Sequence, residues 1–316
     1  MATKRILSGI KPTGRTHIGN YFGALKQWVD LQNSGEYECV FMIADYHTLN
    51  FIKDPEEMRS LTHEIILDYL AIGLDPKKVI LFKQSDISAH TELTWIFDTL
   101  VTVPYLMRAH AYKDAEAQGK EVSAGTFNYP VLMASDILLY SPDLVPVGAD
   151  QKQHVEYARD IAEKFNNAFG ETFKLPEEMI VKEVAVVPGI DGKKMSKSYG
   201  NTIPLFASDE EIEKLVMAIV TDSGADIPEN VYAIHKLVRA ESELKSIYEE
   251  NKGKYKALKD ILVEDLKKFI APMREKRKII ANDPNLLTEI LKDGGERAKA
   301  IADLKLQEVK KKIGVI

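Results

Sequence analysis

Residues 5–25 read RILSGIKPTGRTHIGNYFGAL, and this stretch indicates how the chain begins to fold. The run Arg5–Ser8 is short and mostly apolar, as expected for a parallel strand that is buried on both faces. Gly9, Pro12 and Gly14 then interrupt any regular pattern and predict a loop. A helical pattern follows the loop. Strand, loop and helix in this order are the repeating unit of an α/β fold.

The same alternation continues along the first 200 residues. Short apolar runs predict four further strands, at Cys39–Ala44, Val79–Phe82, Leu144–Val147 and Val184–Val187. The clearest helix between them begins at Asp54, a capping residue followed by Pro55, and ends at Gly73. We therefore expect residues 1–200 to form a doubly wound, Rossmann-like parallel sheet. Ligands of such sheets bind beyond the carboxyl ends of the strands.

The strand patterns stop near residue 200. Helical patterns then cover the ranges 209–220, 232–250, 255–280 and 286–311. We expect a second, all-helical domain in residues 201–316. Residues 267–278 carry a net charge of +5, from Lys267, Lys268, Arg274, Lys276, Arg277 and Lys278 against Glu275. This cluster is either a solvated helix face or a binding surface for a polyanion.

The composition excludes several classes of protein. The 316 residues suit two domains, and the net charge of −6 argues against general coating of nucleic acid. Cys39 is the single cysteine, which excludes an internal disulfide, a zinc knuckle and a cysteine-bound iron–sulfur cluster. No signal peptide and no apolar run of membrane-spanning length, about 18 residues or more, is visible, so we expect a cytosolic protein.

Polar residues follow the predicted strands. His17 and Asn20 lie three residues apart at a helix N-terminus, where free backbone N–H groups favour phosphate. Gly19 between them leaves room for close approach of a flat ring. An N-terminal histidine is, however, also a common helix cap. The second strand ends in Asp45, Tyr46 and His47, which are either ligand-binding residues or an ordinary polar strand end.

Two acidic residues have a similar ambiguity. Asp150 follows the strand Leu144–Val147 after Gly148, where it either accepts hydrogen bonds from a ribose or caps the next helix, which Gln151 opens. Asp136 lies in the apolar run PVLMASDILLY, where an unpartnered carboxylate is costly. It therefore needs a buried partner such as an arginine, a capping role, or an N–H or O–H group of a ligand.

Residues 191–201 read DGKKMSKSYGN and have no apolar periodicity, so they do not predict a helix or strand. Lysines and hydroxyl groups dominate the segment. We interpret it as a mobile loop that closes on a negatively charged ligand.

The combination of these segments resembles a known family. HIGN at 17–20 is similar to the first signature of class I aminoacyl-tRNA synthetases, with Asn20 in place of the usual histidine, and KMSKS at 194–198 matches the second. The flanks PTGRTHIGNYFGAL, LMASDILLYSPDLVPVGADQKQHVEYARDIA and KKMSKSYGNTI resemble the tryptophanyl-tRNA synthetase family. The resemblance implies a Rossmann-like catalytic domain, a helical anticodon-binding domain and a homodimer. It also implies a tryptophan–tRNA ligase reaction, in which ATP and L-tryptophan give tryptophanyl-adenylate and pyrophosphate, and tRNA(Trp) then accepts the amino acid.

The resemblance also implies roles for individual residues. Catalytic roles fall to His17, Asn20, Lys194 and Lys197. ATP binding falls to Lys11, Pro12, Thr13, Gly19, Asn20, Gly148, Ala149, Asp150, Lys194, Met195, Ser196, Lys197 and Ser198. Tryptophan binding falls to Asp136 for the indole N–H, Tyr129 and Gln151 for the ammonium, His47 near the carboxylate, and Met133, Val145 and Val147 as walls. Mg²⁺ is expected to arrive with ATP. Lys113 either reaches the phosphates or is a solvated loop lysine.

Three positions depart from the commoner pattern of the family: Leu7, Lys11 and Ala149. They put the carboxylate contacts and the packing around the indole in doubt. Three other functions compete with this interpretation. A tyrosyl-tRNA synthetase shares both signatures but needs a polar pair around a phenol. A nucleotidyltransferase for a small acid needs no helical domain, and a non-catalytic RNA-binding relative needs no intact signatures.

Overall fold

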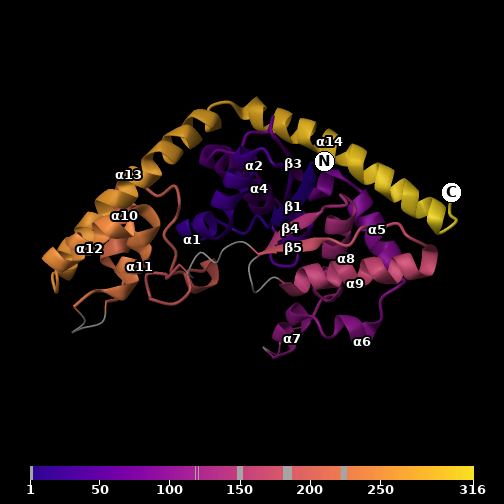
Figure 1. The fold of residues 1–316 in the computed structure, drawn as a ribbon, viewed down its shortest axis with the longest axis horizontal. Coiled ribbons are helices and arrows are strands. Elements are labelled where there is room, and N and C mark those ends of the chain that lie inside the picture. Colours follow the sequence, from indigo (N-terminus) through magenta and orange to yellow (C-terminus); the bar gives the residue numbers. More distant parts are fainter. Residues whose placement is uncertain (1–2, 118, 120, 148–151, 181–186, 222–225) are drawn as a thin grey trace.

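A computed structural model describes residues 3–117, 119, 121–147, 152–180, 187–221 and 226–316. Its centre is a parallel sheet of five strands in the order β3-β2-β1-β4-β5. The predicted doubly wound class is confirmed (Figure 1). The strands are β1 (Lys4–Ile10), β2 (Tyr37–Ile43), β3 (Val79–Lys83), β4 (Leu144–Val147) and β5 (Glu177–Ile180).

The fifth strand of the described sheet was not predicted from sequence. It is Glu177–Ile180, which pairs with β4, whereas the predicted strand is Val184–Val187. Residues 184–186 lie outside the described part of the chain, and Val187 lies in no strand. The prediction followed apolar residues, whereas β5 is an edge strand that begins with two glutamates. Pairing to β4 decided its position, and apolar content did not.

The two faces of the sheet support two hydrophobic cores. Successive residues of a strand point to opposite faces. Ile6 and Phe41 accordingly enter one core with helices α2 and α4, whereas Leu7 and Val40 enter the other with α5, α8 and α9. The helices of this part are α1 (Ile18–Asn20), α2 (Lys26–Ser34), α3 (Asp45–Thr48), α4 (Pro55–Ile72), α5 (Ala89–Asp98), α6 (Val103–Leu106), α7 (His110–Ala117), α8 (Ala124–Leu138) and α9 (Lys152–Phe169). Short irregular helical turns are η1 (Tyr21–Leu25), η2 (Gln84–Asp86) and η4 (Lys197–Tyr199).

After residue 200 the described chain is helical. Its helices are α10 (Asp209–Met217), α11 (Glu229–Val238), α12 (Glu241–Glu250), α13 (Tyr255–Ala281) and α14 (Pro284–Lys312). The single helix predicted over 232–250 is in fact two, because Arg239 has an extended backbone between α11 and α12. This break lets α12 fold back, so that the rings of Tyr232 and Tyr248 lie 4.7 Å apart.

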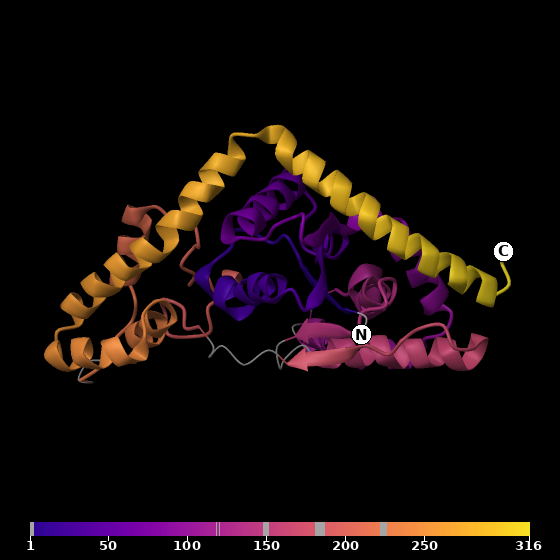
Figure 2. The same cartoon turned by 45° about the horizontal axis from the view of Figure 1, so that its top comes forward.

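Helices α13 and α14 form an arch along one side of the molecule (Figures 1 and 2). α14 returns to the sheet and covers the edge strand β3. Arg297 of α14 donates to the carbonyl oxygen of Val79 at 3.0 Å. A Cβ atom at Gly294 would overlap the carbonyl oxygen of Leu81, so this close approach requires glycine. The last helix therefore packs closely against the edge of the sheet.

Candidate functional site

Two cavities lie at the carboxyl ends of the central strands. The larger has a volume of about 780 Å³ and the smaller about 420 Å³. Only Ile10 and Lys11, at the end of β1, line both. The sequence-based expectation that ligand sites follow the strand ends therefore agrees with the geometry.

The first loop and helix α1 form one wall of the larger cavity. His17 is the N-cap of α1, and its Nδ1 accepts a hydrogen bond from the backbone N–H of Asn20 at 3.3 Å. The Asn20 side chain accepts in return from the N–H of His17. Burial, and then the charge of Lys197, lower the pKa of His17 to about 4, so the ring is neutral at neutral pH. The two interpretations of His17 are thus compatible, because one side chain both caps the helix and lines the cavity.

The space beside Gly19 is already occupied. A Cβ there would lie 2.9 Å from Nδ1 of His17 and 3.4 Å from the side chain of Met195. Glycine is therefore needed for contact between the first loop and the lysine-rich loop. Gly19 also lines the larger cavity, and its role in admitting a flat ring stays a prediction.

The lysine-rich loop forms the opposite wall and is held by its own hydrogen bonds. Asn201 Oδ1 accepts from the N–H of Ser196 at 2.8 Å, and its Nδ2 donates to Asp191 at 2.6 Å. Lys197 donates to the carbonyl oxygen of Gly14 at 2.8 Å, which joins the two signature segments. Burial lowers the pKa of Lys197. Buried Asn201 therefore organises the loop in this structure, and closure of the loop on a negatively charged ligand stays a prediction.

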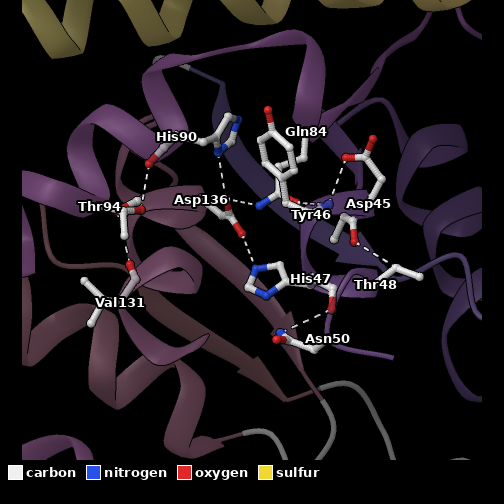
Figure 3. A network of polar contacts seen from close by, with 12 residues as sticks. Asp45, Tyr46, His47, Thr48, Asn50, Gln84, His90, Thr94, Val131 and Asp136 are labelled. Atoms are coloured by element: carbon white, nitrogen blue, oxygen red, sulfur yellow. Dashed lines mark hydrogen bonds and ion pairs between the residues drawn. The ribbon is translucent and has the colours of Figure 1, made fainter. Parts of the chain in front are cut away.

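The smaller cavity contains one buried carboxylate with three side-chain partners (Figure 3). Asp136 of α8 is 2% exposed. Its Oδ1 accepts from Gln84 Nε2 and His90 Nδ1, and its Oδ2 is bonded to His47 Nε2, each at 2.7 Å. Burial alone would raise the pKa of Asp136, but hydrogen bonds from His47 and His90 hold it at about 2. Asp136 is therefore an ionised acceptor at physiological pH.

His47 and Tyr129 form the polar part of the wall beside Asp136. Their rings meet edge to face with centroids 4.5 Å apart. Burial, and then Asp136, raise the pKa of Tyr129 to about 12, so its hydroxyl group keeps its proton. Nδ1 of His47 is buried and has no hydrogen-bond partner among the residues that the structure describes.

Lys11 lies where the two cavities meet. Its ammonium group is 5.0 Å from the ring centre of Phe51 and 5.4 Å from that of Tyr129. Burial lowers the pKa of Lys11. Within the described ranges no carboxylate pairs with this ammonium group, so the junction of the cavities carries a positive charge.

The structure gathers most of the predicted site residues into these two cavities. The larger is lined by Lys11, Thr13, His17, Gly19, Asn20 and Lys194 to Ser198, and the smaller by His47, Tyr129, Met133, Asp136, Val145 and Val147. Pro12 is buried beside them, and the exposed Lys113 lines neither cavity. Gly148, Ala149, Asp150 and Gln151 lie outside the described residues.

Sequence reasoning missed three residues around Asp136. Gln84 directly follows strand β3, so a search of strand ends would have found it. His90 lies within α5, and Tyr140 follows α8, with no local signal that connects either to Asp136. The partners are thus two histidines and a glutamine in place of the arginine considered from sequence.

The described residues contain neither a membrane-spanning helix nor a group of side chains that could hold a metal ion. No described helix is long and apolar enough to cross a membrane. In the same part of the chain, no group of three or more acidic, histidine or cysteine side chains is arranged to hold a metal ion.

Comparison with known proteins gives a consistent result. The family model for class I tRNA synthetases (W and Y) matches residues 2–288. The tryptophan–tRNA ligase of Fusobacterium nucleatum is 45% identical, over 99% of this chain and 98% of the relative. The ligase of Rhodopirellula baltica is 42% identical, over 98% and 99%. A crystal structure of tryptophanyl-tRNA synthetase from Campylobacter jejuni, complexed with ADP and tryptophan, superposes with a TM-score of 0.90 at 43% identity, covering 98% of this chain and 99% of that one.

Proposed function

The chain belongs to the class I tRNA synthetases of the tryptophan and tyrosine group, and on that premise we propose that it is a tryptophan–tRNA ligase. It activates L-tryptophan with ATP, giving tryptophanyl-adenylate and pyrophosphate. The adenylate then transfers tryptophan to the 3′ end of tRNA(Trp) and releases AMP. Both half-reactions take place between the two cavities.

The observation that carries this proposal is an unfilled acceptor site on Asp136, at the wall of the smaller cavity. A carboxylate has about four lone-pair sites, and three on Asp136 are filled by protein donors. The remaining site on Oδ2 suits one N–H donor. Most of the other lining residues are apolar, among them Leu7, Met133 and Val145. An indole offers one N–H group on a large apolar body, which is the ligand chemistry that such a cavity favours.

The larger cavity is our proposed ATP site. His17 and Asn20 present the N-terminus of α1, and Lys194 and Lys197 supply positive charge from the opposite wall. Charge develops on the leaving pyrophosphate, so a lysine placed there stabilises the transition state more than the ground state. Lys11, at the junction, faces the place where the tryptophan carboxylate meets the α-phosphate. Tyr129 and His47 are proposed to hold the amino-acid backbone.

Other parts of the proposed site rest on the family resemblance. Gly148, Ala149 and Asp150 would hold the ribose, and Gln151 the ammonium group; all four lie outside the described residues. Mg²⁺ would be bound through the ATP phosphates and would neutralise their charge.

We also propose the division into a catalytic domain, 1–200, and an anticodon-binding domain, 201–316.

The basic cluster at 267–278 supports tRNA binding less fully than its charge indicates. Four of its six cations have carboxylate partners within the chain: Lys267, Arg274, Arg277 and Lys278. Lys268 and Lys276 are exposed and have no such partner within the described ranges. They are the candidates for contact with phosphates.

A homodimer in the cytoplasm completes the proposal. Its support is the exposure of large apolar side chains on α5 and α6, where Trp95 is 72% and Val103 61% exposed. Exposed apolar patches commonly mark a protein interface. Sedimentation of the wild type and a Trp95→Glu variant tests this surface.

Amino-acid-dependent exchange of pyrophosphate into ATP tests the activation step. We expect exchange with tryptophan and little with tyrosine, followed by charging of tRNA(Trp). Lys197→Ala should lower the exchange rate by about a hundredfold, because one transition-state contact is lost. Lys193→Ala, an exposed lysine of the same loop, is the matched control. Exchange that depends on tyrosine instead would contradict the proposal.

A further inference from the structure

The side of Asp136 that faces away from the cavity is bound by a buried chain of polar groups. His90 Nδ1 lies 2.7 Å from Asp136 Oδ1, and His90 Nε2 lies 2.8 Å from the hydroxyl group of Tyr140. His90 and Tyr140 are both 0% exposed and line neither of the two cavities described above. These two residues therefore reach a ligand only through Asp136.

The chain has a defined direction of donation. Asp136 is an ionised acceptor, so His90 Nδ1 donates to its Oδ1. In the tautomer that carries its proton on Nδ1, Nε2 is an acceptor. The hydroxyl group of Tyr140, which burial keeps protonated, therefore donates to Nε2 at 2.8 Å. Tyr140 thus fixes the tautomer of His90, and His90 fixes the carboxylate.

Packing fixes the chain in position. The ring of Tyr140 lies 5.2 Å from Phe82 and 5.6 Å from His90, between centroids. Gln84 adds a second donor to the same oxygen, so Oδ1 is fully used by the protein. Figure 3 shows His90 and His47 on opposite sides of Asp136, with Gln84 at a third. On Asp136 itself, the acceptor site that the described donors leave unfilled is on Oδ2, at the cavity.

We propose that His90 is a positioning residue that, held by Tyr140, orients the Asp136 carboxylate so that one lone pair points at the indole N–H and sets the preference for tryptophan. This inference rests on the proposed function. It adds two residues that touch no ligand to the determinants of amino-acid selectivity. A donor-bearing ligand gains from a fixed acceptor, whereas phenylalanine, which has no N–H, gains nothing.

The test compares His90→Leu, His90→Asn and Tyr140→Phe in pyrophosphate exchange with tryptophan and with phenylalanine. His90→Leu removes the donor, and we expect the KM for tryptophan to rise roughly tenfold or more. The value of kcat at saturating tryptophan and the KM for ATP should change far less. The ratio of kcat/KM between tryptophan and phenylalanine should fall by a similar factor. His90→Asn returns an N–H near the position of Nδ1 and should restore most of both quantities.

Tyr140→Phe keeps the aromatic packing if His90→Leu does not fold. It frees the imidazole to adopt the other tautomer, and we expect a smaller rise in the KM for tryptophan, about threefold to tenfold. The matched control is Tyr248→Phe, which removes the tyrosine hydroxyl group that lies 3.2 Å from Nδ1 of a second buried histidine, His235. That control should leave the KM values for tryptophan and for phenylalanine unchanged.

Some outcomes overturn the inference. One is a folded Tyr140→Phe or His90→Leu variant with wild-type selectivity. Another is a His90→Asn variant as impaired as His90→Leu. A wild type without tryptophan-dependent exchange contradicts the proposed function and the inference with it. An active wild type with unaffected variants contradicts the inference alone.

Discussion

Two regions of this protein contain the same kind of buried hydrogen-bonded chain, which consists of a tyrosine, a histidine and an aspartate. In each, the tyrosine hydroxyl is bonded to one imidazole nitrogen and the aspartate to the other. One chain lies on the face of the sheet that α5 and α8 cover, and the other lies among the helices after residue 200. The first consists of Tyr140, His90 and Asp136, and the second of Tyr248, His235 and Asp265.

The two chains differ in what the aspartate meets at its far end. Asp265 lies 3.1 Å from Nε of Arg239, a permanent cation on the same helical unit. Among the described residues, the side-chain donors to Asp136 are two histidines and a glutamine, and its last acceptor site faces a cavity. The arrangement around Asp265 is complete within the protein and holds helices together. The arrangement around Asp136 lacks one donor, which is the property of a binding site.

The largest expected difference is between Asp136→Asn and Asp265→Asn. The amide in place of Asp136 loses the ionised acceptor, and we expect the KM for tryptophan to rise about a hundredfold, with a narrower gap to phenylalanine. Asp265→Asn should lower the melting temperature and leave the KM values for tryptophan and phenylalanine unchanged. Exchange kinetics beside thermal melts measure both. An Asp136→Asn variant that is less stable but equally selective would show that the two chains are alike.

Arg239→Gln sharpens the comparison from the other side. It leaves Asp265 with His235 as its remaining close partner, and a carboxylate that is mostly buried loses its permanent cation. We expect the free energy of unfolding to fall by roughly 1–3 kcal/mol. Tryptophan activation should not change. Denaturant unfolding gives the first quantity, and a stability equal to that of the wild type would mean that Arg239 is not needed to complete the chain.

Acidification should separate the two chains. Burial outweighs the hydrogen bond that His235 donates to Asp265 and lowers the pKa of His235 below 6.5. The unfolded state then binds more protons, so stability falls as the pH drops below about 6.5. The pKa of Asp136 is lowered to about 2 from 3.8, so its contribution is complete above 3.8 and is lost only as the pH falls towards 2. The melting curve of His235→Asn should therefore depend less on pH below about 6.5 than that of the wild type. Equal slopes would remove His235 from this account.

The smallest effect concerns the surface of the helical region. Lys276→Glu should weaken tRNA binding and reduce the slope of log Kd against log salt by about 1, if this lysine meets a phosphate. Lys278→Glu is the control, because Lys278 already pairs with Glu275 at 2.8 Å. Filter binding at several salt concentrations measures the slopes. Equal slopes for both variants would make the cluster a solvated helix face.

The sequence by itself determined the class of fold and the position of the site. Apolar runs of strand length, with helical patterns between them, predicted four of the five parallel strands, because those strands are buried on both faces. Polar residues at strand ends marked both cavities. His17, Asn20 and Lys197 could be predicted as site residues because a helix N-terminus and nearby lysines are local patterns that favour phosphate.

Only the tertiary structure decided what completes each site. β5 was missed because an edge strand is set by pairing and not by apolar content. α14 lies on β3, more than 200 residues away in sequence, through Arg297. Asp136 seemed alone for the same reason, since His47, Gln84 and His90 are 46 to 89 residues distant along the chain. Hydrogen bonds act over about 3 Å, and no sequence pattern records which distant side chains the fold brings within that distance.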